Sequence, residues 1–197
     1  MTEKADPART TGLICLFYAA IGAAALLLSG LTPIPWPWEV TGPSVWPWYL
    51  LVLLGVAVGV VTAWAALALE RRIPVAKRLG DRVRALFGEL TLGQAAAIAL
   101  SSGVVEEVVF RGLVLMAASY LTQSVVLGLL LSSVLFGMVH RAPGREGVYW
   151  SVVAGLLGLL FGGLLLLTSS LLPPMAAHAT HNAVALARQR ARPASPS

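Results

Sequence analysis

Long apolar runs constrain the fold of this chain more than any other feature of its sequence. Residues 12–31 and 48–69 are almost entirely apolar. A bilayer core about 30 Å thick is crossed by roughly 20 such residues in a helix, and helices satisfy their own backbone hydrogen bonds in lipid. Further apolar runs cover 91–119, 123–140, 148–167 and 171–187. Because 57% of the residues are hydrophobic and only 12% are charged, we predict an all-α, polytopic bundle of about six transmembrane helices.

The segments between these runs have distinct compositions. Residues 1–11 are polar and are predicted to form a disordered cytoplasmic N-terminus. Residues 32–47 alternate proline with tryptophan, which excludes one continuous helix and suits the headgroup layer. Residues 73–90 place basic residues between apolar ones at spacings of three and four, which predicts an amphipathic helix on an anionic membrane face. The expected divisions are 1–11, an N-terminal pair of spans with the amphipathic helix (12–90), a core formed by the remaining spans (91–187) and a basic cytoplasmic tail (188–197).

Basic residues indicate how the spans are oriented, because cytoplasmic loops of membrane proteins are enriched in lysine and arginine. With six spans and both termini in the cytoplasm, 13 of the 14 basic residues fall in cytoplasmic segments. They are Lys4, Arg9, Arg71, Arg72, Lys77, Arg78, Arg82, Arg84, Arg141, Arg145, Arg188, Arg190 and Arg192. The net charge of +5 is therefore attributed to topology and to anionic lipid rather than to nucleic acid. The expected location is the cell membrane, with multiple passes.

Glycine pairs within the runs predict where helices approach closely. Gly55 and Gly59 are four residues apart in the second run, and Gly158 and Gly162 repeat this spacing in the fifth. Small residues at this spacing allow two helix backbones to come together.

Three charged residues, Glu106, Glu107 and Arg111, lie inside the third apolar run. A charge at the centre of a membrane helix costs about 2.5 to 3.5 kcal/mol on insertion scales, so such residues usually serve a function. Glu107 and Arg111 are four residues apart with the acid first, which favours an ion pair on a helix. Glu106 points about 100° away from Glu107. It is therefore left to contact water and act as a general base.

The three histidines of the chain lie in later runs. His178 and Asn182 are four residues apart and share a helix face, with His181 beside them, and such donors can stabilise an oxyanion. Phe136 and His140 have the same spacing near the end of the fourth run. Polar groups in spans also join helices or relay protons. The alternatives to an enzyme are therefore a non-proteolytic membrane scaffold or immunity protein, and a proton-coupled transporter.

These residues form three motifs that resemble those of one protein family. The segments are Glu106-Glu107-Val-Val-Phe-Arg111, which fits E-E-x-x-x-R, Phe136-Gly-Met-Val-His140, which fits F-x-x-x-H, and His178-Ala-Thr-His181-Asn182, which fits H-x-x-x-N. Gly112 follows the arginine, as it often does in the family. Over about 92–187 the chain thus resembles the CPBP intramembrane proteases, which include CAAX prenyl endopeptidases and bacteriocin-processing or bacteriocin-immunity proteins.

The resemblance implies an intramembrane endopeptidase that hydrolyses a peptide bond in a membrane-associated, CAAX-type or other protein or peptide. Glu106 and His140 would activate water. His178 and Asn182 would form the oxyanion hole. The residues implied to support the site are Glu107, Arg111 and Phe136, with His181 as a further candidate. The expected partners are the lipid bilayer and a membrane-bound substrate, with no nucleic acid.

A metal is the alternative way to activate water in this family. The chain has no H-E-x-x-H motif, and zinc would need ligands gathered from three helices, namely Glu106, His140 and His178. We therefore expect that no cofactor is required and that a glutamate mechanism operates, with a divalent metal such as zinc as the alternative.

The expected contact between Glu106 and His140 poses a geometric problem. Glu106 lies about 22 Å along the helix from the start of the third run, whereas His140 ends the fourth run at the cytoplasmic side. The two side chains meet only if the third helix tilts or starts below the bilayer, or if a water-filled cavity opens to the cytoplasm. We expect such a cavity.

Overall fold

The structure is a computed structural model that describes residues 6–87 and 89–190, and within these ranges it is helical and contains no strand. The helices are α1 (Pro7–Leu31), α2 (Pro37–Thr41), α3 (Trp48–Arg72), α4 (Pro74–Phe87), α5 (Leu92–Glu107), the π-helix η1 (Val108–Val114), α6 (Leu115–Thr122), α7 (Val125–Val139), α8 (Gly144–Thr168) and α9 (Leu172–Arg190). The predicted all-α class is confirmed.

Three of the described helices, α1, α3 and α8, are long and apolar enough to cross a membrane. Each has 25 residues, whereas the apolar helix α7 has 15. The segments α5, η1 and α6 follow one another without a break, so the third predicted run is one continuous helical segment. These are the features of a membrane protein. The span number and the orientation of the termini stay predictions.

The ends of α1 and α9 differ from the predicted segment limits. Helix α1 begins at Pro7, where the Asp6 side chain accepts a hydrogen bond of 3.0 Å from the Ala8 N–H. Proline suits the first helical position because its missing N–H needs no partner there. The predicted disorder therefore does not extend to residues 7–11. Helix α9 continues to Arg190, and the remainder of both predicted tails, 1–5 and 191–197, lies outside the described residues.

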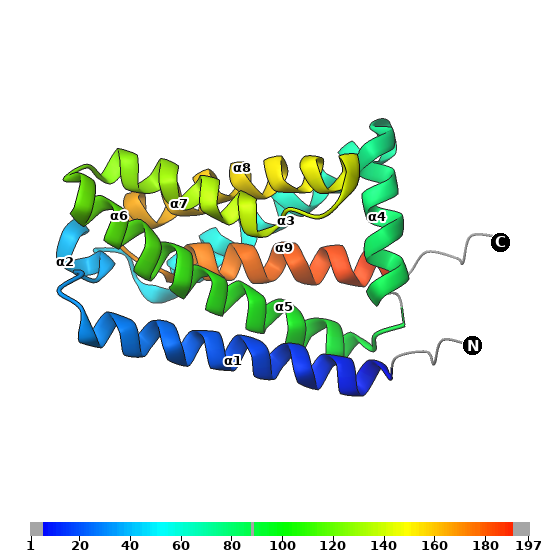
Figure 1. The fold of residues 1–197 in the computed structure, drawn as a ribbon, viewed down its shortest axis with the longest axis horizontal. Helices are drawn as coiled ribbons and strands as arrows, with labels where there is room; N and C mark the ends of the chain where they lie inside the picture. The colour runs from blue at the N-terminus through cyan, green and yellow to red at the C-terminus, as the bar shows by residue number, and fades with distance from the viewer. Residues whose placement is uncertain (1–5, 88, 191–197) are drawn as a thin grey trace.

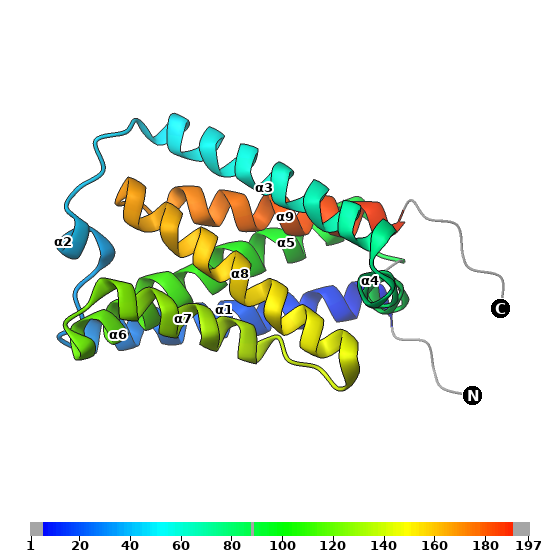
Figure 2. The same ribbon diagram turned by 90° about the horizontal axis from the view of Figure 1, so that it is seen from above.

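Helix α9 lies at the centre of the bundle (Figures 1 and 2). It packs between α3 and α5 and also contacts α8 and α4. Helix α7 packs against α8 and α6, and α1 lies along α5 at the outside of the bundle. Helix α4 crosses the end of the bundle at which α1 begins and α9 ends. The predicted amphipathic segment is thus a separate helix that runs across the others.

Ion pairs connect α4 to the start of α8. Arg78 Nε donates to Glu146 Oε1 at 2.5 Å, and Arg82 Nη2 lies 3.3 Å from Glu146 Oε2. Arg82 also donates to the Pro143 carbonyl oxygen at 3.3 Å. These contacts fix the short connection between α7 and α8, which begins at His140.

Glycines allow α3 to approach α9 closely. A Cβ added to Gly55 or Gly59 would lie 2.7 Å from Ala176 Cβ or Thr180 Cβ, respectively, and would overlap a backbone carbonyl oxygen of α9. The packing role predicted for this pair is therefore confirmed. Gly158 plays the same part between α8 and α7, because a Cβ there would lie 3.2 Å from Ser133 Cα.

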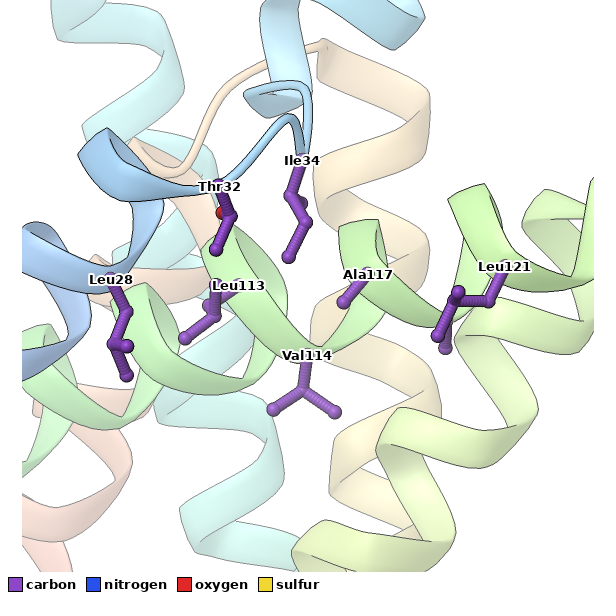
Figure 3. A pocket seen from close by; sticks show the side chains of 8 residues that line it. Leu28, Thr32, Ile34, Leu113, Val114, Ala117 and Leu121 are labelled. Carbon is purple, nitrogen blue, oxygen red and sulfur yellow. The ribbon is translucent and has the colours of Figure 1, made fainter.

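An apolar groove of about 390 Å³ lies between the end of α1, the segment that follows it, and the helical segment η1–α6 (Figure 3). It is lined by Leu28, Thr32, Ile34, Leu113, Val114, Ala117, Ala118 and Leu121. None of the predicted site residues lines this groove, and its aliphatic side chains offer no group for catalysis.

The contact between α3 and α9 predicts that Gly59→Ala destabilises the protein. The new methyl group forces the two backbones apart, and overpacking of this kind costs about 1 to 3 kcal/mol. We expect thermal unfolding of the purified protein in detergent at a clearly lower temperature. The matched control is Gly163→Ala in α8, where a Cβ meets nothing within 4 Å. Equal unfolding temperatures for the two variants would contradict the assigned packing.

Candidate active site

The charged cluster lies where α5 continues into the π-helix. Glu106 and Glu107 are the last two residues of α5, and Arg111 lies in the middle of η1. A π-helical turn adds a residue to a helix and often marks a functional site.

Arg111 and Glu107 form the predicted ion pair, and both are almost completely buried, with side-chain exposures of 1% and 0%. Arg111 Nη1 donates to Glu107 Oε1 at 3.0 Å, and Nη2 donates to the Gly158 carbonyl oxygen of α8 at 3.1 Å. The guanidinium also lies 4.5 Å above the Phe136 ring of α7, a cation–π contact. Arg111 therefore connects its own segment to α7 and α8.

His178 of α9 joins the same carboxylate. Its Nδ1 lies 2.8 Å from Glu107 Oε1. An ionised carboxylate only accepts hydrogen bonds, so Nδ1 carries a proton. The other ring nitrogen, Nε2, lies 3.8 Å from Glu106 Oε2. Two aromatic rings flank the imidazole, Phe136 at 5.8 Å and Phe161 at 5.5 Å between centroids.

His140 approaches Glu106 from the end of α7. Its Nδ1 lies 2.7 Å from the Phe136 carbonyl oxygen, which only accepts, so this nitrogen also donates. Its Nε2 lies 3.7 Å from Glu106 Oε2. The imidazole packs on the Phe136 ring at 4.5 Å and meets Trp150 edge to face at 5.7 Å.

The short length of α7 explains how His140 reaches Glu106. At 1.5 Å per residue, the 15 residues of α7 span about 22 Å and the 25 residues of its neighbour α8 span about 37 Å. Helix α7 therefore ends before the end of the bundle, and Figure 1 shows the chain continuing from there towards the start of α8 beside α4. The predicted water-filled cavity stays a prediction.

Glu106 has two carboxylate oxygens in different surroundings. Oε1 accepts a hydrogen bond of 2.6 Å from the Tyr18 hydroxyl of α1. Oε2 is buried, has no hydrogen-bond partner, and faces Nε2 of both His140 and His178. The side chain as a whole retains 14% exposure. Glu107 Oε2 also has no hydrogen-bond partner among the described residues, but the Glu107 side chain is completely buried, so Glu106 is the carboxylate of the cluster that retains exposure.

Asn182 and His181 contact other helices. Asn182 Nδ2 donates to Ser102 Oγ of α5 at 2.9 Å, one helical turn before Glu106. His181 Nδ1 lies 3.0 Å from Thr62 Oγ1 of α3, so this histidine joins α9 to α3. The structure thus brings Glu106, His140 and His178 together, whereas Asn182 is held one turn along α5 and His181 faces α3.

Several residues of the cluster were not predicted. Tyr18 lies in an apolar run without any motif around it, and a tyrosine there resembles any packing residue. Gly158 contributes through its backbone carbonyl, which no pattern of side chains reveals. Ser102 and Trp150 belong to none of the three motifs, so their contacts with Asn182 and His140 were not predicted either.

Metal binding is the alternative raised by the sequence for Glu106, His140 and His178. Within the part of the chain that the structure describes, no group of three or more His, Cys, Asp and Glu side chains is arranged to hold a metal ion. The expectation that no cofactor is required stays a prediction.

The buried ion pair predicts that Arg111→Ala strongly destabilises the protein. The change leaves the Glu107 carboxylate buried without its cation, and breaking such a pair costs about 3 to 5 kcal/mol. We expect a large loss of monodisperse protein on size-exclusion chromatography in detergent and a lower unfolding temperature. Arg145→Ala removes an exposed arginine at the start of α8 and should leave both measurements unchanged. Normal yield and unfolding temperature for Arg111→Ala would show that the pair is dispensable.

Comparison with known proteins gives one match. Residues 88–184 match the family model described as Type II CAAX prenyl endopeptidase Rce1-like. The matched region contains the two glutamates, the arginine and all three histidines, and it excludes α1 with Tyr18. The comparisons with curated proteins and with solved structures found no significant match. The match confirms the resemblance carried by the three motifs: over residues 88–184 the chain is similar to the Rce1-like type II CAAX prenyl endopeptidases, a family of membrane-embedded proteases.

Proposed function

We propose that this protein is an intramembrane endopeptidase in which Glu106 activates the attacking water. The observation that supports this is the buried Oε2 of Glu106, which has no partner and faces two imidazole nitrogens at 3.7 and 3.8 Å. These distances are too long for direct hydrogen bonds, and we propose that a water molecule binds between the groups.

The hydrogen bonds of His140 determine its part in the reaction. Because Nδ1 donates to the Phe136 carbonyl oxygen, Nε2 of the neutral ring is an acceptor. A water between His140 and Glu106 donates one hydrogen bond to Nε2 and one to Oε2. Its oxygen lone pair is then free to attack a carbonyl carbon.

His178 is hydrogen-bonded to the Glu107 carboxylate, whereas His140 is bonded to a backbone carbonyl oxygen, so the two histidines have different roles in the proposed reaction. For His178 to stabilise an oxyanion, Nε2 must carry a proton in addition to the one on Nδ1. Glu107, at 2.8 Å from Nδ1, is the counterion for the resulting imidazolium, and Arg111 fixes the same carboxylate oxygen. A donor held in place before the reaction stabilises charge that develops in the transition state.

The proposed reaction consumes one water and one peptide bond. The water oxygen adds to the carbonyl carbon while Glu106 takes a proton from the water. The resulting oxyanion accepts hydrogen bonds from His178 and Asn182. To reach the oxyanion, the Asn182 amide rotates away from Ser102, its partner in the structure. The carbon–nitrogen bond then breaks, and Glu106 returns the proton to the leaving amine. The products are a carboxylic acid and an amine, and transfer of the acid proton to the amine gives a carboxylate and an ammonium group.

The substrate proposed from the family is a membrane-associated peptide or protein, with a prenylated CAAX sequence as the first candidate. Apart from Arg111, the basic residues whose side chains the structure describes belong to α4 or to helix ends beside it, such as the start of α1 and the end of α3 (Figure 1). The positive-inside rule supports a cytoplasmic location for this end, and the proposed topology therefore has six spans and both termini in the cytoplasm.

The proposed role of Glu106 predicts that Glu106→Gln abolishes cleavage. The amide keeps the size of the side chain but cannot take a proton, and general-base catalysis contributes about 10²- to 10⁴-fold. The measurement is cleavage of a farnesylated CAAX peptide, and of its unprenylated form, tethered to liposomes that contain the purified protein. Asp81→Asn makes the same chemical change at an exposed site on α4 and should retain activity. Equal turnover by Glu106→Gln and the wild type would overturn the proposal.

The proposed glutamate mechanism predicts that cleavage survives removal of metal ions. Protein dialysed extensively against a strong chelator should retain its rate in chelated buffer, because Glu106 and His140 act directly on water. The metal content of the same sample, measured by mass spectrometry, provides the control. Loss of activity that returns on addition of zinc would instead support a metal-dependent mechanism.

A further inference from the structure

Tyr18 of α1 forms a polar contact with the candidate active site. Its hydroxyl donates to Glu106 Oε1 at 2.6 Å. The residue is partly buried, and it lies outside the region matched by the family model. Neither the motifs nor the match therefore gives it a role.

The position of Tyr18 is fixed by the way α1 packs along α5. Gly22, one turn further along α1, faces Val105, because a Cβ there would lie 3.3 Å from Val105 Cγ2. Cys15, about one turn before Tyr18, has its Sγ 3.5 Å from Ser101 Oγ. Positions 15, 18 and 22 share one face of a helix, since their spacings are three and four. This contact face directs the phenol of Tyr18 towards Glu106.

The hydrogen bond makes the two oxygens of Glu106 inequivalent. With Oε1 occupied by the phenol, the plane of the carboxylate is fixed and Oε2 faces His140 and His178. Without the hydroxyl, no donor holds Oε1, and the carboxylate can rotate about its terminal bond. A terminal torsion of this kind is broad in the absence of a partner.

We propose that Tyr18 is a positioning residue for catalysis, which orients the Glu106 carboxylate so that Oε2 receives the proton of the attacking water. This inference rests on the proposed protease function. It extends the catalytic apparatus from the matched region to the first helix of the chain.

Tyr18→Phe tests the inference because it removes the hydroxyl and keeps the ring. We expect kcat for the liposome-tethered peptide to fall by between about tenfold and a hundredfold, the range typical of a misplaced catalytic group. KM and the unfolding temperature should stay close to those of the wild type, because the substrate contacts and the α1–α5 packing are kept. Tyr49→Phe removes an exposed phenol from α3 and should leave kcat unchanged.

A second variant separates positioning from packing. Cys15→Ala weakens the same contact between α1 and α5 but leaves the Tyr18 hydroxyl in place, so we expect normal kcat. If Tyr18→Phe and Cys15→Ala lower kcat and the unfolding temperature together, Tyr18 is only a packing residue and the inference is overturned.

The remaining outcomes distinguish the two proposals. If Glu106→Gln is inactive while Tyr18→Phe keeps the kcat and KM of the wild type, the positioning role is overturned and the proposed function stands. If Glu106→Gln cleaves as fast as the wild type, the proposed function fails and the inference about Tyr18 fails with it.

Discussion

The buried contact between Arg111 and Glu107 is the interaction on which the rest of the site depends. A charge removed from water is costly unless it is paired and hydrogen-bonded, and here the pair is completed by the Gly158 carbonyl oxygen and the Phe136 ring. The same carboxylate oxygen binds His178. One guanidinium therefore fixes the relative positions of η1, α7, α8 and α9. The positions of His140 and His178 beside Glu106 follow from contacts that do not include Glu106 itself.

The adjacent residues Glu106 and Glu107 have different roles because a helix turns by about 100° per residue, so their side chains face different neighbours. Glu107 faces the centre of the bundle with no exposed surface, and both its cation and its imidazole partner are built into the fold. Glu106 faces α1 and the two Nε2 atoms, and keeps one carboxylate oxygen without a partner. Among the described residues, Glu107 Oε2 also lacks a partner, but Oε1 of Glu107 binds both the cation and the imidazole, whereas Glu106 is hydrogen-bonded only to the Tyr18 hydroxyl. The structural role therefore falls to Glu107, and the chemical role is left to Glu106.

The sequence predicted those parts of the molecule that depend on spacing along one helix. The apolar runs gave the helices, and the separation of four residues gave the Arg111–Glu107 pair. The contact of Tyr18 with Glu106 depends on the packing of α1 against α5. No sequence pattern around either residue indicates this contact. The hydrogen bond to the Gly158 carbonyl oxygen uses a backbone atom, which no pattern of side chains reveals. The contacts between helices that neither a motif nor a glycine pair marks therefore escaped prediction.

Helix α9 shows how an apolar bundle accommodates a polar helix. Its polar side chains meet partners on the surrounding helices, namely Glu107 and Ser102 on α5 and Thr62 on α3. A lipid-facing position would leave these groups without hydrogen bonds, at a cost of several kcal/mol each. Gly59 of α3 and Gly103 of α5 lie against the backbone of α9, where a Cβ would collide. The small residues and the polar residues are thus two parts of one arrangement, because the backbones must approach closely before short side chains can form hydrogen bonds between helices.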